Sequence, residues 1–241
     1  MADFSKPELQ ADFLPRLGRH LAHELNNPIS AISSAAFLIQ DFIETTEGGK
    51  VDVEMIKPFV ESISEECEKL KSVVEEFSKY VATESILAMP IEVNEFVRMR
   101  VVEMVRDGQL VTFHGSEGPT TIIGDAGALQ FVLRALVSYS LVSGATLVTI
   151  SVSNGSPSKG AGSLSKAAGE QCVITIRDDR GQPPADDEIA DVFDPLPKRR
   201  TTGLGLKLPL VKKLIELHHG SIELRALGSG GAEVFIVIPK A

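Results

Sequence analysis

The stretch His20–Ile32 reads HLAHELNNPISAI and decides how the rest of the chain is interpreted. Its apolar residues recur at alternating spacings of four and three, which places them along one side of an α-helix: Leu21, Leu25, Pro28 and Ile32. His23 lies off this side, with Glu24 beside it and Asn27 one helical turn further on, so we expect its imidazole to face solvent. An exposed histidine beside a carboxylate and an amide is a candidate nucleophile, although a histidine on a polar helix face is more often only solvated.

The composition is that of a globular protein with a real core. The chain has 241 residues, 43% of them hydrophobic and 24% charged, and a formal net charge of −9. No Lys/Arg-rich run lies among aromatic residues, which argues against binding to nucleic acid. No stretch reaches the roughly 20 apolar residues of a membrane span, and the N-terminus lacks a signal-peptide core. We therefore expect a cytoplasmic protein with no membrane partner.

The cysteine content predicts no disulfide and no metal site. Cys67 and Cys172 are far apart in the sequence, and both fall on apolar positions. We therefore expect both to be reduced and structural.

Residues 1–88 are predicted to form a helical hairpin. After a polar lead-in over residues 1–12, one helix is expected from about residue 13 to 46 and a second from about 53 to 83, separated by a glycine break. The stripe of the first helix is Leu14, Leu21, Leu25, Ile32, Ala35, Ile39 and Phe42, and that of the second is Ile56, Val60, Ile63, Cys67, Leu70, Val74, Phe77 and Val81. One hairpin cannot bury two full stripes, so we expect two copies to form a four-helix bundle. A purely structural dimer would explain the stripes but not the HELNNP string.

Residues 89–241 alternate between strand and helix patterns, as α/β domains do. Strands are expected at 91–93, 111–114, 120–123, 147–152, 172–177, 221–227 and 232–239. Helices are expected at 94–106, from the Asp125 cap to 142, at 186–193 and at 204–218. The strands at 111–114 and 120–123 flank a turn over 115–118, and residues 153–170, rich in Gly and Ser, are expected to form a flexible loop.

The string HELNNP is similar to the phosphoacceptor box of two-component sensor histidine kinases. In that family the histidine takes a phosphoryl group and passes it to an aspartate of a response regulator. The resemblance implies that His23 is the phosphoacceptor, that Glu24 accepts the imidazole proton, and that Asn27 orients water for dephosphorylation of the regulator. Pro28 matches the proline that kinks the helix below the site.

The C-terminal run TTGLGLKLPLVKKLIELHHGSIEL resembles the glycine box and last helix of the ATPase domains of the same family. Glycines there let the backbone approach phosphates at a helix N-terminus. Asp179-Arg180-Gly181 resembles the box whose aspartate hydrogen-bonds the adenine amino group, with Pro183 where the family has a further glycine. The resemblance also implies a phenylalanine box at 192–195 and a lid at 196–202. The nucleotide-binding residues that it implies are Asp179, Gly181, Gly203 and Gly205.

The position that holds Mg²⁺ in the family departs from the pattern. The family's helix carries an asparagine there, whereas alignment puts Tyr139 at this position and Ala135 at a second, commonly Asn, site. Tyrosine is a poor Mg²⁺ ligand, and phosphoryl transfer depends strongly on the metal. The resemblance therefore implies a degenerate ATPase domain that requires no cofactor, with ATP and Mg²⁺ kept as an alternative.

These patterns together predict an α+β protein: a helical hairpin that forms a four-helix bundle in the dimer, then an α/β sandwich resembling the histidine-kinase ATPase domain. With the degenerate metal position and no sensor domain in the sequence, the predicted function is that of a phosphorelay histidine phosphotransferase. His23 would exchange a phosphoryl group between the aspartates of receiver domains, with a hybrid kinase upstream. Two alternatives stay open: a sensorless ATP-dependent histidine kinase, and a non-catalytic dimeric regulator that binds receivers.

Overall fold

The computed structural model describes residues 7–46, 53–104, 110–155, 170–195, 205–228 and 230–241. The chain divides into two units. The first unit contains the residues up to Ala82, together with a short segment that ends at Leu206. The second unit contains residues 83–199 and 207–241. The predicted lid at 196–202, Gly203, and residues 156–169 of the predicted loop lie outside the described ranges.

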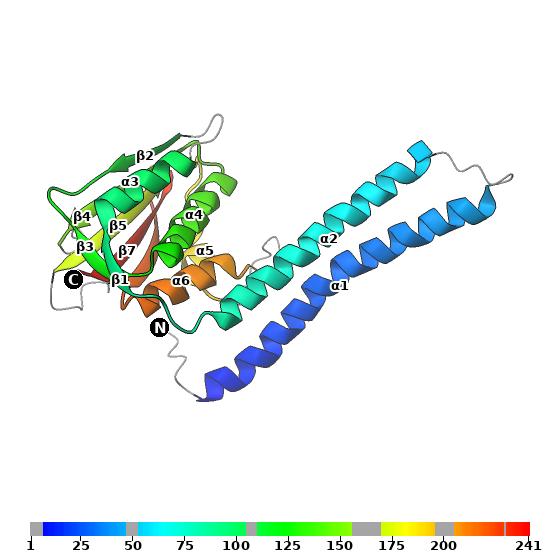
Figure 1. Ribbon diagram of the computed structural model, residues 1–241, viewed down its shortest axis with the longest axis horizontal. Helices are drawn as coiled ribbons and strands as arrows, with labels where there is room; N and C mark the ends of the chain where they lie inside the picture. Colours follow the sequence, from blue (N-terminus) through cyan, green and yellow to red (C-terminus); the bar gives the residue numbers. More distant parts are fainter. Residues whose placement is uncertain (1–6, 47–52, 105–109, 156–169, 196–204, 229) are drawn as a thin grey trace. The chain divides into compact units, whose positions relative to one another are not determined.

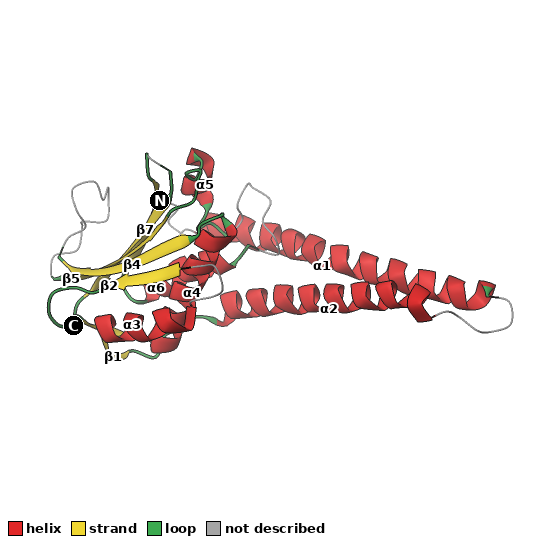
Figure 2. Ribbon diagram, turned by 90° about the horizontal axis from the view of Figure 1, so that it is seen from above, coloured by secondary structure: helices red, strands yellow, loops and turns green. Residues whose placement is uncertain are grey.

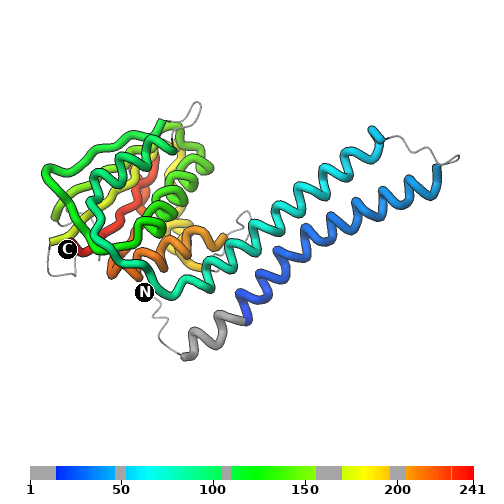
Figure 3. The backbone as a smooth tube through the Cα atoms, in the orientation of Figure 1, coloured from blue at the N-terminus to red at the C-terminus, as the bar shows by residue number. Residues whose placement is uncertain are grey.

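The first unit is a hairpin of two long helices, α1 (Pro7–Thr45) and α2 (Val53–Ala82), which run side by side (Figures 1 and 3). Helix α1 begins at Pro7 rather than near residue 13, so the predicted polar lead-in is wrong from Pro7 onward. Proline suits the first turn of a helix because the N–H that it lacks has no partner there. The helix continues through both Pro15 and Pro28.

Each helix of the hairpin carries two apolar stripes, and a single hairpin covers one of them. The covered stripes include the buried residues Pro28, Ala35 and Val73. The other stripes are exposed and repeat every seven residues: Ile29, Ala36 and Ile43 on α1, and Val53, Val60, Cys67, Val74 and Val81 on α2. The predicted stripe of α2 therefore alternates in a single chain between half-buried residues that face α1 and exposed residues, among them Cys67. These two sets of exposed residues are called the seam below.

The second unit contains seven strands and four helices in the described ranges. The strands are β1 (Met89–Glu92), β2 (Leu110–His114), β3 (Thr121–Gly124), β4 (Leu147–Asn154), β5 (Gln171–Asp178), β6 (Ser221–Ala226) and β7 (Ala232–Pro239). The helices are α3 (Val93–Met104), α4 (Ala126–Val142), α5 (Asp186–Asp191) and α6 (Lys207–Leu217). The main sheet has the order β2-β4-β5-β7-β6, in which β2 and β4 are parallel and the other neighbours antiparallel.

The strands predicted on either side of residues 115–118 form, but they belong to different sheets. Strand β2 is an edge of the main sheet, whereas β3 pairs with β1 in a separate two-stranded sheet. Polar contacts hold the connection in place: Ser116 N–H donates to Asn94 Oδ1 at 2.9 Å, and Thr120 N–H donates to Glu92 Oε1 at 3.0 Å. These bonds tie the connection to the start of α3, so the chain does not turn back along β2.

Helices α3, α4 and α6 cover one face of the main sheet (Figures 1 and 2). The alternation of β5 places Cys172, Ile174 and Ile176 on the buried side, each at most 3% exposed. Leu136 of α4 and Ile215 of α6 are fully buried. This continuous core fixes α4 and the end of β5, which carry the second site described below.

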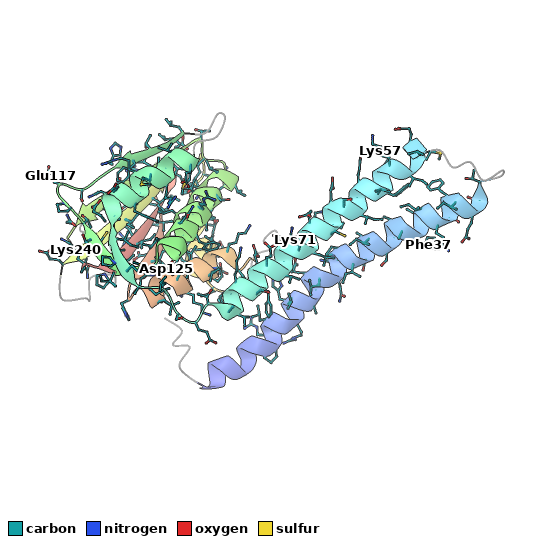
Figure 4. The ribbon with its side chains drawn as sticks, in the orientation of Figure 1. Phe37, Lys57, Lys71, Glu117, Asp125 and Lys240 are labelled. Carbon is teal, nitrogen blue, oxygen red and sulfur yellow. The ribbon has the colours of Figure 1, made fainter. Side chains whose placement is uncertain are left out.

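The predicted cap of α4, Asp125, is confirmed; Figure 4 labels this residue. Its carboxylate accepts from Ala128 N–H and from Leu87 N–H, each at 2.9 Å. Its own N–H donates to Nε2 of the buried His218 at 3.0 Å, while His218 Nδ1 lies 2.7 Å from Leu214 O. One nitrogen therefore accepts and the other donates, so the bonding assigns a neutral imidazole to His218.

His219 has φ of 58°, the one positive φ of a non-glycine residue in the described part of the chain. Because this conformation strains a residue with a Cβ, His219→Gly is expected to raise the free energy of unfolding by about 1 kcal/mol. Urea denaturation measures the change. His114→Gly, at an ordinary strand end, is the control and is expected to lower stability. A His219→Gly protein no more stable than wild type contradicts this account.

Candidate functional sites

His23 lies on α1 with its side chain exposed, as predicted. Glu24 beside it is half-buried, Asn27 one turn later is exposed, and Pro28 is buried against the hairpin. The helix thus presents an accessible ring nitrogen with a carboxylate and an amide on neighbouring positions. This arrangement can hold a neutral imidazole for attack on an electrophile and can accept its proton.

The other four histidines are less suited to nucleophilic attack. His20 is half-buried, one turn before His23, and the residue after it is Leu21. His114 is exposed at the end of β2, followed by a glycine, and His218 is buried with both ring nitrogens engaged. His219 adopts the strained turn after α6. His23 is therefore the one histidine of the sequence that combines an exposed side chain with an adjacent carboxylate.

A second polar cluster lies where β5 ends. Asp178 and Arg180 form a buried ion pair, with side chains 2% and 3% exposed and Arg180 Nη2 2.6 Å from Asp178 Oδ2. Arg180 Nε also donates to Asp178 Oδ1 at 2.9 Å, and Ala232 N–H donates to the same oxygen at 3.0 Å. Burial alone would raise the pKa of the Asp178 carboxyl, but the hydrogen bonds from Arg180 and Ser140 outweigh it and hold that pKa below its usual value.

Tyr139 of α4 joins this ion pair to α5. The Arg180 guanidinium lies 4.7 Å from the centroid of the Tyr139 ring, and its Nη1 donates to the Tyr139 hydroxyl at 3.3 Å. That hydroxyl donates to Glu188 Oε1 at 2.5 Å. Burial and the bond to Glu188 raise the pKa of Tyr139 well above its usual value, so it stays a neutral donor. Asp178, Arg180, Tyr139 and Glu188 are together called the α4–α5 cluster below.

Asp179, the predicted adenine acceptor, has an exposed side chain that binds the neighbouring strand. Its Oδ1 accepts from Thr146 N–H at 2.8 Å and Leu147 N–H at 2.9 Å, and its Oδ2 accepts from the Thr146 hydroxyl at 2.7 Å. These bonds, led by that from Leu147, hold the pKa of Asp179 below its usual value. Gly181 is exposed, with no heavy atom within 4 Å of where a Cβ would lie, and Gly205 has φ of 65°.

The described side chains suit the adenine of a nucleotide better than they suit a Mg²⁺ ion. The Asp179 carboxylate is exposed beside open space at Gly181, so an acceptor for an amino group is available there. Mg²⁺ fits less well, because the Tyr139 hydroxyl is engaged with Glu188 and Asp178 is paired with Arg180. No group of three His, Cys, Asp or Glu side chains that could hold a metal occurs in the ranges that the structure describes. In this arrangement the Tyr139 hydroxyl and the Asp178 carboxylate are thus both engaged with protein partners.

Sequence reasoning missed the Asp178–Arg180 pair and its link to Glu188. The strand period carried the necessary signal, because residues 172, 174, 176 and 178 share the buried side of β5. Asp178 is thus the buried carboxylate of the two adjacent aspartates, and it needs a cation nearby. The contact between Tyr139 and Glu188 joins residues 49 positions apart and had no local signal.

Two family descriptions match consecutive parts of this chain. Residues 16–84 match the His Kinase A (phospho-acceptor) domain, and residues 124–241 match the histidine kinase-, DNA gyrase B-, and HSP90-like ATPase. The sensor histidine kinase ZraS of Salmonella typhimurium is 26% identical over 227 residues, which cover 92% of this chain and 45% of ZraS. The C4-dicarboxylate transport sensor protein DctS of Rhodobacter capsulatus is 22% identical, over 94% of this chain and 33% of DctS. The chain spans less than half the length of these relatives.

Solved structures share the fold. The Acinetobacter baumannii histidine kinase AdeS aligns with a TM-score of 0.60 and 20% identity, over 90% of this chain and 97% of that one. Histidine kinase ThkA, crystallised in complex with response regulator protein TrrA, aligns with a TM-score of 0.68 and 20% identity, over 98% of this chain and 65% of that one. The predicted fold, a helical hairpin followed by an α/β ATPase-type domain, is confirmed.

The comparisons support the kinase alternative better than the predicted phosphotransferase. The ATPase match favours ATP binding, and the named relatives are sensor proteins rather than phosphotransferases. The prediction of a degenerate ATPase domain receives no support from these matches. Among the described helices, none is long and apolar enough to cross a membrane.

Proposed function

Because this chain belongs to the two-component histidine kinase family, we propose that it transfers a phosphoryl group from ATP to His23 and then to a receiver aspartate. The observation that carries the proposal is the exposed His23 with Glu24 beside it, inside the part of the chain that matches the phosphoacceptor domain. We assign residues 1–88 to dimerisation and phosphotransfer and residues 89–241 to ATP binding.

The side chains around His23 suit each step of this transfer. In the first step a ring nitrogen of neutral His23 forms a bond to the γ-phosphorus, the bond from that phosphorus to the ADP oxygen breaks, and the ring proton passes to Glu24. In the second step a receiver carboxylate oxygen takes the phosphoryl group and His23 regains a proton. We assign to Asn27, which is one turn away and exposed, the role of orienting a water molecule for dephosphorylation of the receiver.

A phosphorelay without ATP is the second candidate function, and the α4–α5 cluster favours it. There Tyr139, in the position where the family carries a metal ligand, is bonded to Glu188 and stacked on Arg180. If this arrangement never opens, a phosphorylated receiver rather than ATP must load His23.

Labelling from two donors separates the two functions. The protein is incubated with γ-labelled ATP and Mg²⁺ in one arm and with a labelled phosphorylated receiver in the other, and each is then chased with unlabelled receiver. Label from ATP that moves to the receiver supports the kinase. Label from the receiver alone supports the relay. No label in either arm contradicts both and leaves the dimeric regulator without catalysis.

We propose that the seam is the face on which two copies form a four-helix bundle. Val60 and Val74 are 49% and 51% exposed in a single chain, and the seven-residue repeat to which they belong is the pattern that pairs helices. Val60→Glu with Val74→Glu is expected to convert the dimer to a monomer, because four carboxylates would then be buried in each bundle. Light scattering coupled to gel filtration measures the mass.

Ser72→Glu is the matched control, because Ser72 is exposed on the opposite side of α2 and should leave the dimer intact. Cys67 offers an independent check, since it lies on the seam whereas the other cysteine, Cys172, is buried. A short bis-maleimide should therefore cross-link wild type into a covalent dimer. A wild-type monomer at micromolar concentration, or a dimer that survives both glutamates, contradicts this assignment.

A further inference from the structure

Helix α5 has little intrinsic stability as a helix. It has six residues, none of them buried, and its N-cap residue Ala185 makes no side-chain capping bond. Helices this short are unstable without tertiary contacts. Its position must therefore depend on a few specific contacts with the rest of the domain.

The hydrogen bond from Tyr139 to Glu188 is such a contact. A short bond from a hydroxyl to a carboxylate is among the stronger hydrogen bonds in proteins. The Tyr139 ring is itself fixed, because it stacks against Arg180, which is locked by Asp178. A rigid donor on α4 thus bonds one carboxylate of this short helix.

The charge of α5 indicates what its position controls. Four of its six residues are acidic: Asp186, Asp187, Glu188 and Asp191. When Glu188 is bonded to Tyr139, a negative charge lies beside the residue that the family resemblance places at the phosphate-bound metal. The cluster then holds two carboxylates, Asp178 and Glu188, against the one guanidinium of Arg180. A phosphate beside it would be repelled, so an anionic ligand favours a state in which Glu188 has moved away.

We propose that α5 is a movable flap, that Tyr139 holds it closed through Glu188, and that nucleotide binds when the flap opens. This inference rests on the proposed ATP-binding function. It assigns Tyr139 a regulatory role in place of the lost metal ligand. The closed arrangement then reduces the apparent affinity for nucleotide by the fraction of molecules that are open.

Hydrogen exchange of the free protein tests the tether without any nucleotide. The reporters are the amides of Ile189, which donates to Ala185 O at 3.0 Å, and Val192, which donates to Glu188 O at 2.9 Å. Tyr139→Phe keeps the ring over Arg180 but removes the hydroxyl, and should speed exchange of both amides by about tenfold. Glu188→Ala should do the same, although alanine is the better helix former. Tyr80→Phe removes the chain's other tyrosine hydroxyl and is the matched control.

Calorimetry with a non-hydrolysable ATP analogue tests the gating role. Tyr139→Phe is expected to bind the analogue several-fold to about tenfold more tightly than wild type, because less free energy is spent on opening. Unchanged exchange at Ile189 and Val192 overturns the tether. An affinity that does not rise in Tyr139→Phe, including undetectable binding by both proteins, overturns the gating. Neither result depends on labelling of His23, so this inference and the proposed function can fail separately.

Discussion

His23→Gln is expected to abolish phosphoryl labelling from ATP and from a phosphorylated receiver alike. Glutamine keeps a polar side chain of similar length but has no ring nitrogen that can attack phosphorus. His23 is exposed and off the packed side of α1, so the substitution should leave the dimer and the unfolding midpoint unchanged. Scintillation counting of the separated protein measures the loss, which should reach background.

His20→Gln is the matched control, because it changes a histidine one turn earlier on the same helix. Its labelling is expected to stay near that of wild type. Circular dichroism of both variants confirms that the hairpin is intact. Label that persists in His23→Gln would place the phosphoryl group elsewhere and refute the role of this residue.

Arg180→Ala is expected to lower the free energy of unfolding by about 3–5 kcal/mol, because it leaves the buried Asp178 carboxylate without its ion pair. Both side chains are at most 3% exposed, so water cannot replace the lost bonds. The same cluster carries Tyr139, and its ring would lose the guanidinium on which it stacks. Chemical denaturation measures the change.

Arg177→Ala provides the comparison, since Arg177 is exposed on the same strand and its loss should cost less than about 0.5 kcal/mol. The pH dependence gives a second reading. The pKa of the Asp178 carboxyl lies below its usual value in the folded protein. Its contribution to the free energy of unfolding is therefore complete above the pKa of the unfolded state, and it is lost as the pH falls through the pKa of the folded state. Equal effects of the two arginine substitutions would contradict the buried pair.

Local patterns predicted much of the fold because several signals agreed at the same positions. The Asp125 cap and the apolar run after it predicted the start of α4, and the two apolar stripes predicted helices α1 and α2. The exposure of His23 followed from its place off the apolar side of α1. Signals of this kind depend on neighbours within one or two helical turns.

Long-range contacts explain what the sequence could not reveal. The pairing of β3 with β1 depends on bonds from residue 116 to α3 and from residue 120 to the end of β1, which no alternation pattern records. The bond of Tyr139 to Glu188 likewise depends on how the end of β5 turns toward α5. The α2 stripe contained both the hairpin contact and the seam, and composition alone could not divide them because both are apolar.

The central claim is that His23 carries the phosphoryl group, and mapping of that group by mass spectrometry at neutral pH tests it most directly. The protein, labelled by its better donor, is digested and fragmented without acid, because phosphohistidine is acid-labile. We expect the phosphoryl group on His23 and none on His20, His114, His218 or His219. A phosphoryl group found reproducibly on another residue, or none on His23 in protein that has taken up label, would contradict the claim.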